Sequence, residues 1–249
     1  MRDILPGKNS LECAELLAGH FNGISDEFLP LDPSEIPRTR HRRPETLLPY
    51  QVAGRLRAFR KPKSMVRGDL FPVLVTACAD FLAIPLANIY SEVSVSGVWP
   101  VAWKMEHVTA IPKCSVPSGL HDLRNISCTL LVSKVLESYV LQWVMEEVKI
   151  RKNQYGGVKG SGAAHMLIDV WQTVLGGLED CRGAAMLTSV DYAKAFNRLS
   201  YQHCLRSFAS HGASNFTLGL LATFLTNRSM AVRVGNAWSE KRAVNGGVP

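Results

Sequence analysis

The run Ser189-Val190-Asp191-Tyr192-Ala193-Lys194-Ala195-Phe196-Asn197-Arg198 joins an apolar stretch to an amphipathic one. The apolar residues of 184–190 predict a strand, and the spacing over residues 193–211 predicts a helix. Asp191 would lie where the two meet. A carboxylate there suits two roles, because Mg²⁺ prefers oxygen ligands and because an aspartate at a helix start caps free backbone amides. The run alone leaves both roles open.

Periodicity on either side of this run predicts an α+β chain. Helical spacing is found over residues 11–24, 45–59, 132–148, 163–178 and 215–226, and residues 71–93 predict two helices that meet at Pro85. Residues 106–111 alternate as a strand does, and residues 230–234 and 239–244 predict a hairpin that turns at Gly235-Asn236. Irregular alternation of strands and helices indicates α+β. Prolines between residues 30 and 44 predict a linker, so the ordered region is expected to begin near residue 45.

Positive charge is concentrated in one segment. The formal net charge of the 249 residues is +7, of which residues 38–67 carry +9 and the remainder −2. A dense basic segment suits the phosphate backbone, so it is predicted to contact nucleic acid. The candidate residues are Arg57, Arg60, Lys61 and Lys63. Two alternatives stay open: a solvated loop followed by a polar helix face, or a nuclear-localisation-like cluster at residues 38–43.

Composition excludes several classes of protein. A hydrophobic content of 47% supports a sizeable core and excludes collagen-like, disordered and disulfide-stapled chains. The six cysteines form no C-x-x-C pair, so reduced thiols are expected. No apolar leader or long uninterrupted apolar span is found, which predicts an intracellular protein of the cytoplasm or nucleus with no membrane contact. No P-loop, G-x-S-x-G or H-E-x-x-H motif is present.

Further short blocks surround Asp191. They are residues 99–104 with 108–113, 122–127, 133–137, 154–161 and 246–249. In this order, and together with the Asp191 run, they resemble the blocks of the reverse transcriptases of non-LTR (LINE-type) retrotransposons. There the blocks read P-x-x-W-K with V-x-P-I-P-K, D-x-R-P-I-S, S-K-x-x-E, Q-x-G-F-x-x-G-x-S and the start of G-V-P-Q-G-S. The resemblance covers residues 98–249.

The resemblance implies an architecture. An N-terminal helix and a linker rich in proline and arginine would occupy residues 1–44. A helix-rich, fingers-like region would occupy residues 45–180, and a partial polymerase palm residues 181–249. The chain is expected to be a fragment, truncated before the family's aromatic-x-Asp-Asp hairpin.

The resemblance also implies a site. Asp191 would be the catalytic metal ligand, joined by the backbone carbonyl of Tyr192. Apart from this implied role, the Tyr192 ring is expected to lie in the core. Phe196 would pack under the incoming sugar and exclude a 2′-hydroxyl. Lys113 and Arg124 would bind the triphosphate, for which the planar fork of arginine is well suited. The template would be approached by a further block, represented by Gln154, Gly156 and Gly160. The block at residues 246–249 would begin a loop that packs near the template and the incoming nucleotide.

The implied activity is that of an RNA-directed DNA polymerase, a nucleotidyltransferase of a transposable element. Its partners would be an RNA template, a DNA primer and deoxynucleoside triphosphates. Two Mg²⁺ or Mn²⁺ ions need carboxylates from both palm motifs, and no Asp-Asp pair occurs in this sequence. The chain alone is therefore expected to be inactive in synthesis. Two alternatives remain: a non-catalytic nucleic-acid-binding remnant, and a helical interaction protein with no nucleic-acid role.

Overall fold

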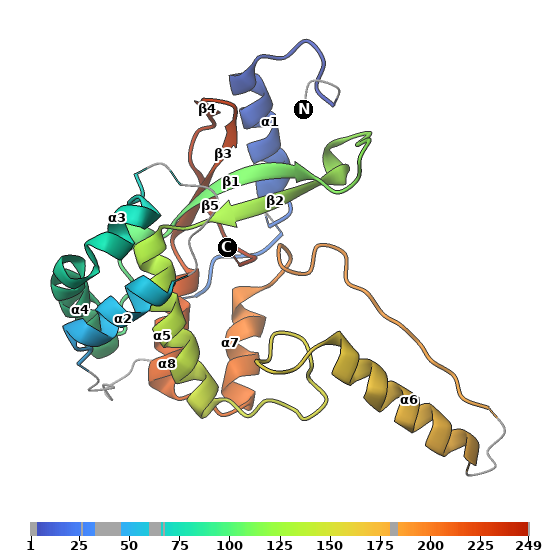
Figure 1. The fold of residues 1–249 in the computed structure, drawn as a ribbon. Helices are drawn as coiled ribbons and strands as arrows, with labels where there is room; N and C mark the ends of the chain where they lie inside the picture. The colour runs from blue at the N-terminus through green and yellow to red at the C-terminus, as the bar shows by residue number, and fades with distance from the viewer. Residues whose placement is uncertain are drawn as a thin grey trace. The chain divides into compact units, whose positions relative to one another are not determined.

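The computed structural model describes residues 4–25, 27–32, 46–59, 66, 68–179 and 184–248. These residues fall into two compact units, one drawn from Met1–Glu147 and Lys194–Pro249 and the other from Val148–Ala193. Helices and a small mixed sheet are combined in the chain, as the α+β prediction required. Figure 1 shows the elements in chain order.

The larger unit contains a five-stranded mixed sheet. Its strands are β1 (Met105–Pro112), β2 (Leu123–Cys128), β3 (Arg228–Val234), β4 (Ala237–Trp238) and β5 (Arg242–Val244). β1 lies between β2, which is antiparallel to it, and β3, which is parallel to it with Val108 opposite Val232. The far edge of β3 pairs with both β4 and β5. The predicted strand at 106–111 and the hairpin are confirmed, but the second arm of the hairpin is split in two, and β2 was not predicted.

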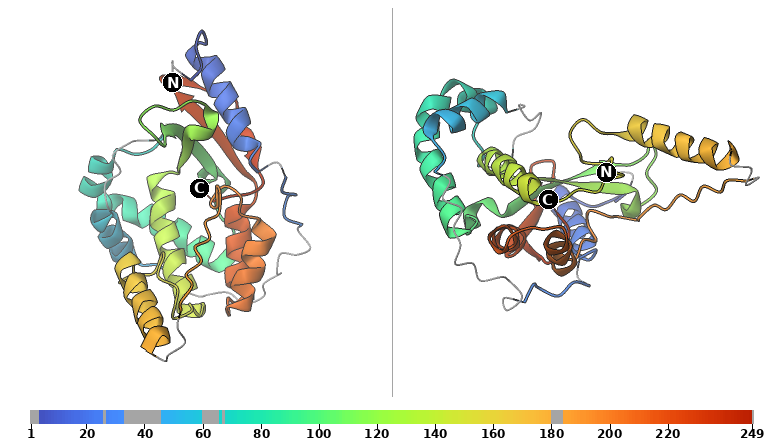
Figure 2. Two further views of the ribbon diagram at one scale, coloured as in Figure 1. Left: turned by 90° about the vertical axis from the view of Figure 1, so that its right-hand side faces the viewer. Right: turned by 90° about the horizontal axis from the view of Figure 1, so that it is seen from below.

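One face of this sheet is covered by α1 (Ser10–Asn22), as Figures 1 and 2 show. The helix begins with a capping box, in which the Asn9 side chain accepts from the Glu12 amide at 2.9 Å and the Glu12 carboxylate accepts from the Asn9 amide at 2.8 Å. Leu17 and its neighbours on α1 pack against Val108 and Val232 in one buried cluster. The order of the chain therefore begins well before residue 45, and that prediction is wrong.

Helices α2 (Pro49–Ala58), α3 (Pro72–Ala77), α4 (Ala79–Ser96) and α5 (Leu131–Glu147) form a second part of the larger unit. α2 packs on α4, and Tyr90 of α4 donates a 2.7 Å hydrogen bond to the Val132 carbonyl of α5. The two helices predicted over residues 71–93 are present, but they separate at Cys78 and not at Pro85, which lies inside α4. The buried residues of α4 continue on both sides of Pro85. Their packing offsets the loss of the backbone hydrogen bond that proline cannot make.

Helices α7 (Tyr201–Ser210) and α8 (Asn215–Leu225) complete the larger unit, and each begins at a serine cap, Ser200 and Ser214. The helix predicted over residues 193–211 is thus wrong in its first third, where residues 193–198 form turns. The carbonyls of Phe196 and Leu199 accept hydrogen bonds from the C-terminal segment, and Ser200 forms a bridge with Gly246. Because those backbone groups are already engaged, they are not available for helical hydrogen bonds.

The smaller unit consists of turns over residues 148–162, helix α6 (Ala163–Glu179) and an irregular segment that includes residues 184–193. The prediction of a helix over residues 163–178 is confirmed. The prediction of a strand over residues 184–190 is wrong, and apolar side chains such as Leu187 and Val190 are each 73% exposed. A strand needs a neighbour for its backbone groups, and within the described part of the chain these residues pair with none.

The sheet joins regions that the sequence analysis assigned to different domains. β1 and β2 come from the predicted fingers-like region, and β3, β4 and β5 come from the predicted palm region. The boundary near residue 180 therefore does not separate two compact units, while the fingers and palm assignments themselves stay predictions. Of the helices in the described ranges, none has both the length and the apolar character to cross a membrane.

Candidate functional site

Two of the predicted sequence blocks meet through their backbones in the larger unit. The amide of Val248 donates to the Phe196 carbonyl at 3.0 Å, and the amide of Gly247 donates to the Leu199 carbonyl at 2.8 Å. Ser200 and Gly246 form an antiparallel bridge beside these bonds. The end of the Asp191 run is therefore fixed against the residues that begin the last block.

Glycine is required on the C-terminal side of this contact. Gly247 has a φ of +80°, and a Cβ there would lie 3.0 Å from the carbonyl oxygen of Phe196. A Cβ at Gly246 would overlap the ring of Phe28. Only a residue without a side chain allows the two backbones to approach this closely.

Residues 27–31, which follow α1, contact the same region of the larger unit. Arg198 donates to both carboxylate oxygens of Glu27, from Nε at 2.9 Å and from Nη2 at 3.0 Å. Leu31 is buried against Leu205 and Leu218 of the α7 and α8 helices. The ion pair is half exposed and contributes little to stability by itself, but its two-point geometry fixes the orientation of Arg198.

A buried ion pair lies under the contact. Arg228 donates from Nε to the Glu106 carboxylate at 2.7 Å, with almost no exposure of either side chain. The Lys104 ammonium donates to the Thr226 carbonyl at 3.2 Å, and burial, aided by the Arg228 charge, lowers the pKa of Lys104. A cavity of about 20 Å³ beside the pair is lined by Glu106 together with Asn197 and residues of β2. The buried pair thus links β1 to the first residue of β3.

Phe196 contributes backbone to the contact, while its ring is 76% exposed. Asp191 and Tyr192 belong to the smaller unit, where irregular backbone carries both and the Tyr192 ring is 77% exposed. The expectation that the Tyr192 ring is buried is wrong. Among the described residues, no group of three or more His, Cys, Asp or Glu side chains is arranged to hold a metal ion. The metal-binding roles of Asp191 and Tyr192 stay predictions.

Lys113 and Arg124 lie on one hairpin. Lys113 directly follows β1, and its ammonium donates to the His121 carbonyl at 2.6 Å; Arg124 is in β2, opposite Ile111. Both side chains are exposed. The loop between the strands is held by Asp122, whose pKa is lowered by hydrogen bonds from the amide and hydroxyl of Ser118. The hairpin brings the two basic residues of the predicted triphosphate site onto one element.

The predicted template residues belong to exposed turns of the smaller unit. The Gln154 amide donates to the Gly156 carbonyl at 2.9 Å, and Gly160 has a left-handed backbone with a φ of +79°. The hydroxyl of Tyr155 bonds to the Asp169 carboxylate, which attaches these turns to α6. Their contact with a template stays a prediction.

The basic segment is described only in part. Arg57 is exposed on α2 and forms an ion pair with Asp80 of α4. An exposed pair of this kind is weak and can be exchanged for a phosphate contact. Arg60, Lys61 and Lys63 lie outside the described residues.

Comparison of the chain with models of known protein families and with curated proteins found no match. Sequence patterns did not predict the other residues around the backbone contact, namely Glu27, Phe28 and the Glu106–Arg228 pair. Among these residues, Arg228 is the one that the sequence could have indicated, because an arginine at the start of an apolar strand needs a buried partner. Neither its partner nor that of Arg198 can be inferred from spacing.

Proposed function

We propose that the chain is part of a reverse transcriptase of the non-LTR retrotransposon type, with fingers-like and partial palm regions. The observation that carries the proposal is the backbone contact of Phe196 and Leu199 with Gly247 and Val248. The resemblance assigns the first block to the sugar of the incoming nucleotide and the second to the template and that nucleotide. The two blocks are far apart in the sequence, and the resemblance gives both a role at the incoming nucleotide. In the fold they lie against each other.

The remaining roles follow from the resemblance and from the chemistry of the side chains. Lys113 and Arg124, exposed on one hairpin, would bind the triphosphate of the incoming nucleotide. Phe196, with its ring exposed, would meet the sugar. Asp191 offers a hard oxygen ligand of the kind that Mg²⁺ or Mn²⁺ prefers. One carboxylate is too few for two ions, so the proposal for this chain alone is the binding of template and primer and not DNA synthesis.

A non-catalytic, nucleic-acid-binding role is the second candidate. The charge distribution favours it, because residues 38–67 carry +9 while the rest of the chain is close to neutral. Such a protein would bind RNA or DNA through phosphates without requiring Asp191 at all. The two candidates share the binding step and differ in whether Asp191 matters once synthesis is possible.

The binding step is tested with a labelled RNA template annealed to a DNA primer. Fluorescence anisotropy over a series of salt concentrations gives the slope of log Kd against log salt. We expect tighter binding at low salt, and we expect Lys61→Ala with Lys63→Ala to reduce the slope by about 2, one unit for each lost phosphate contact.

The control is the pair Lys8→Ala and Lys241→Ala, which removes the same charge outside the basic segment. It should change the slope far less. Binding that does not respond to salt, or an equal effect of the two double variants, would show that the basic segment is not the contact surface.

A further inference from the structure

A cavity of about 440 Å³ lies in the larger unit between α5, α7 and α8, away from the backbone contact described above. Its walls are mostly apolar. They are formed by Val140, Leu141, Val144, Phe208, Leu221 and Phe224. Leu141 is 61% exposed, whereas Val140 and Val144 on the same wall of α5 are buried, so the rim of the cavity is open to solvent. Binding sites for small molecules are typically about 300–1,000 Å³ with walls of this kind.

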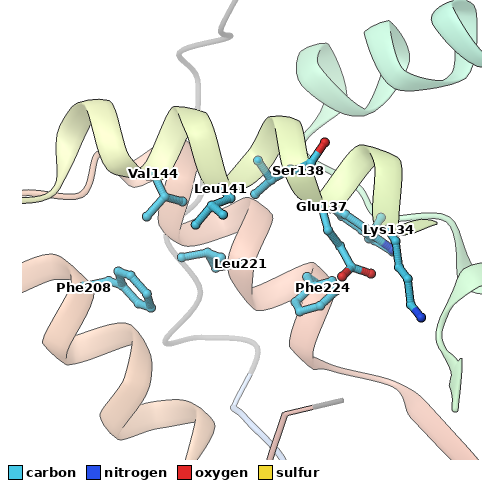
Figure 3. Close-up of a pocket in the computed structure, with 10 residues that line it drawn as sticks. Lys134, Glu137, Ser138, Leu141, Val144, Phe208, Leu221 and Phe224 are labelled. Atoms are coloured by element: carbon cyan, nitrogen blue, oxygen red, sulfur yellow. The ribbon is translucent and has the colours of Figure 1, made fainter. Parts of the chain in front are cut away.

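The cavity has an apolar end and a polar end, as Figure 3 shows. Val144, Leu141 and Phe208 surround one end, and Leu221 lies in the middle. At the other end the Glu137 carboxylate points toward Phe224, and Lys134 lies beside it. Ser138 also lines the cavity, but its hydroxyl is already engaged by Arg55 at 2.7 Å and by the Val135 carbonyl at 2.6 Å. Glu137 is therefore the acceptor that faces the apolar walls.

The surroundings of the Glu137 carboxylate indicate which kind of ligand group would bind to it. The carboxylate accepts from the Ser133 hydroxyl at 3.0 Å and also from the Thr129 side chain. It retains the capacity to accept one more hydrogen bond, because an ionised carboxylate has about four lone-pair sites. Burial raises the pKa of Glu137, against the opposing effects of Ser133, Arg228 and Lys134. A hydrogen-bond donor brought in by a ligand would stabilise the charged form at this end of the cavity.

We propose that this cavity binds a small, largely aromatic molecule that donates one hydrogen bond, from an N–H or ammonium group, to the Glu137 carboxylate. The rings of Phe208 and Phe224 offer faces and edges for an aromatic body, and the aliphatic side chains of α5 cover it from the opposite wall. This site uses none of the residues assigned to template, nucleotide or metal, although Glu137 lies in the block at residues 133–137.

The test uses two probes of nearly equal size. Indole has an N–H donor, and 1-methylindole lacks it. Saturation-transfer NMR with the 249-residue chain measures the affinity of each. We expect indole to bind about tenfold more tightly than 1-methylindole, and Glu137→Gln to reduce that difference, because the gain comes from a donor bonded to a charged acceptor.

Leu141→Glu tests whether the ligand binds in this cavity, because it places a charge at the apolar end. The substitution leaves the fold intact because the position is exposed. The matched control is Leu11→Glu on α1, where the leucine is 53% exposed against 61% for Leu141. Leu141→Glu should abolish indole binding and Leu11→Glu should not. Equal binding of the two probes, equal effects of the two variants, or no binding at all would overturn the proposal. A dimer that Leu141→Glu dissociates would also overturn it, because a second copy would then fill the cavity.

Discussion

At the scale of single residues, Gly247 allows the two blocks of the candidate site to approach each other closely. Its left-handed backbone and its nearness to the Phe196 carbonyl are separate constraints, and both exclude a side chain. The block that contains it was recognised from the sequence by resemblance alone. The structure supplies the physical reason for a glycine there.

Gly247→Ala should lower the free energy of unfolding of the larger unit by more than the cost of placing alanine in a left-handed backbone conformation. The backbone costs about 1–2 kcal/mol, and the close carbonyl adds roughly 1 kcal/mol or more. Gly97→Ala is the control, since Gly97 is also left-handed at φ +69° but its Cβ would meet only an ordinary contact at 3.6 Å. Urea denaturation of both variants measures the difference. If the two substitutions cost the same, the close approach at Gly247 has no energetic effect.

At the scale of elements, α1 shows that tertiary packing decides how much a short helix contributes to stability. Its sequence predicts an amphipathic helix, and the prolines after it predict a linker, with the ordered region beginning only near residue 45. In the fold, Leu17, Ala18 and Phe21 close the core on one face of the sheet. Proline marks the end of an element but says nothing of whether that element is packed, so the error was one of tertiary context.

Leu17→Ala should therefore destabilise the protein by about 2–5 kcal/mol, as expected for a leucine in a closed core. Leu17 is 0% exposed, whereas Leu11 of the same helix is 53% exposed. Leu11→Ala should change the free energy of unfolding by no more than about 0.5 kcal/mol. Thermal or urea unfolding measures both. Equal, small effects would mean that α1 is not part of the folded core.

Elements that depend on local pattern were predictable, and elements that depend on a partner were not. The helix at Leu131–Glu147 follows from the spacing of its apolar residues, and the strand at Met105–Pro112 follows from alternation. The expected strand before Asp191 has the right composition, yet it lacks a neighbour within the described part of the chain. The start of the expected helix after Asp191 was displaced by backbone bonds to residues 247 and 248. Contacts between distant segments carry no local signal.

At the scale of the whole molecule, one sheet joins β1 and β2 to β3, β4 and β5, so the regions on either side of the smaller unit fold together. Residues of the candidate site were predicted by resemblance, but the buried Glu106–Arg228 pair and the Glu27–Arg198 pair that support it were not. Each joins residues more than a hundred positions apart. No spacing rule for helices or strands reaches that far.

The most direct test of the polymerase proposal is RNA-templated primer extension by the full-length product of the reading frame that contains these 249 residues. The account predicts that Asp191→Ala reduces extension by about a thousandfold or more while the affinity for template and primer stays unchanged, because a metal ligand acts on synthesis and not on phosphate binding. Glu179→Ala, an acidic residue at the end of α6, should extend normally. Extension that survives Asp191→Ala undiminished would contradict the account.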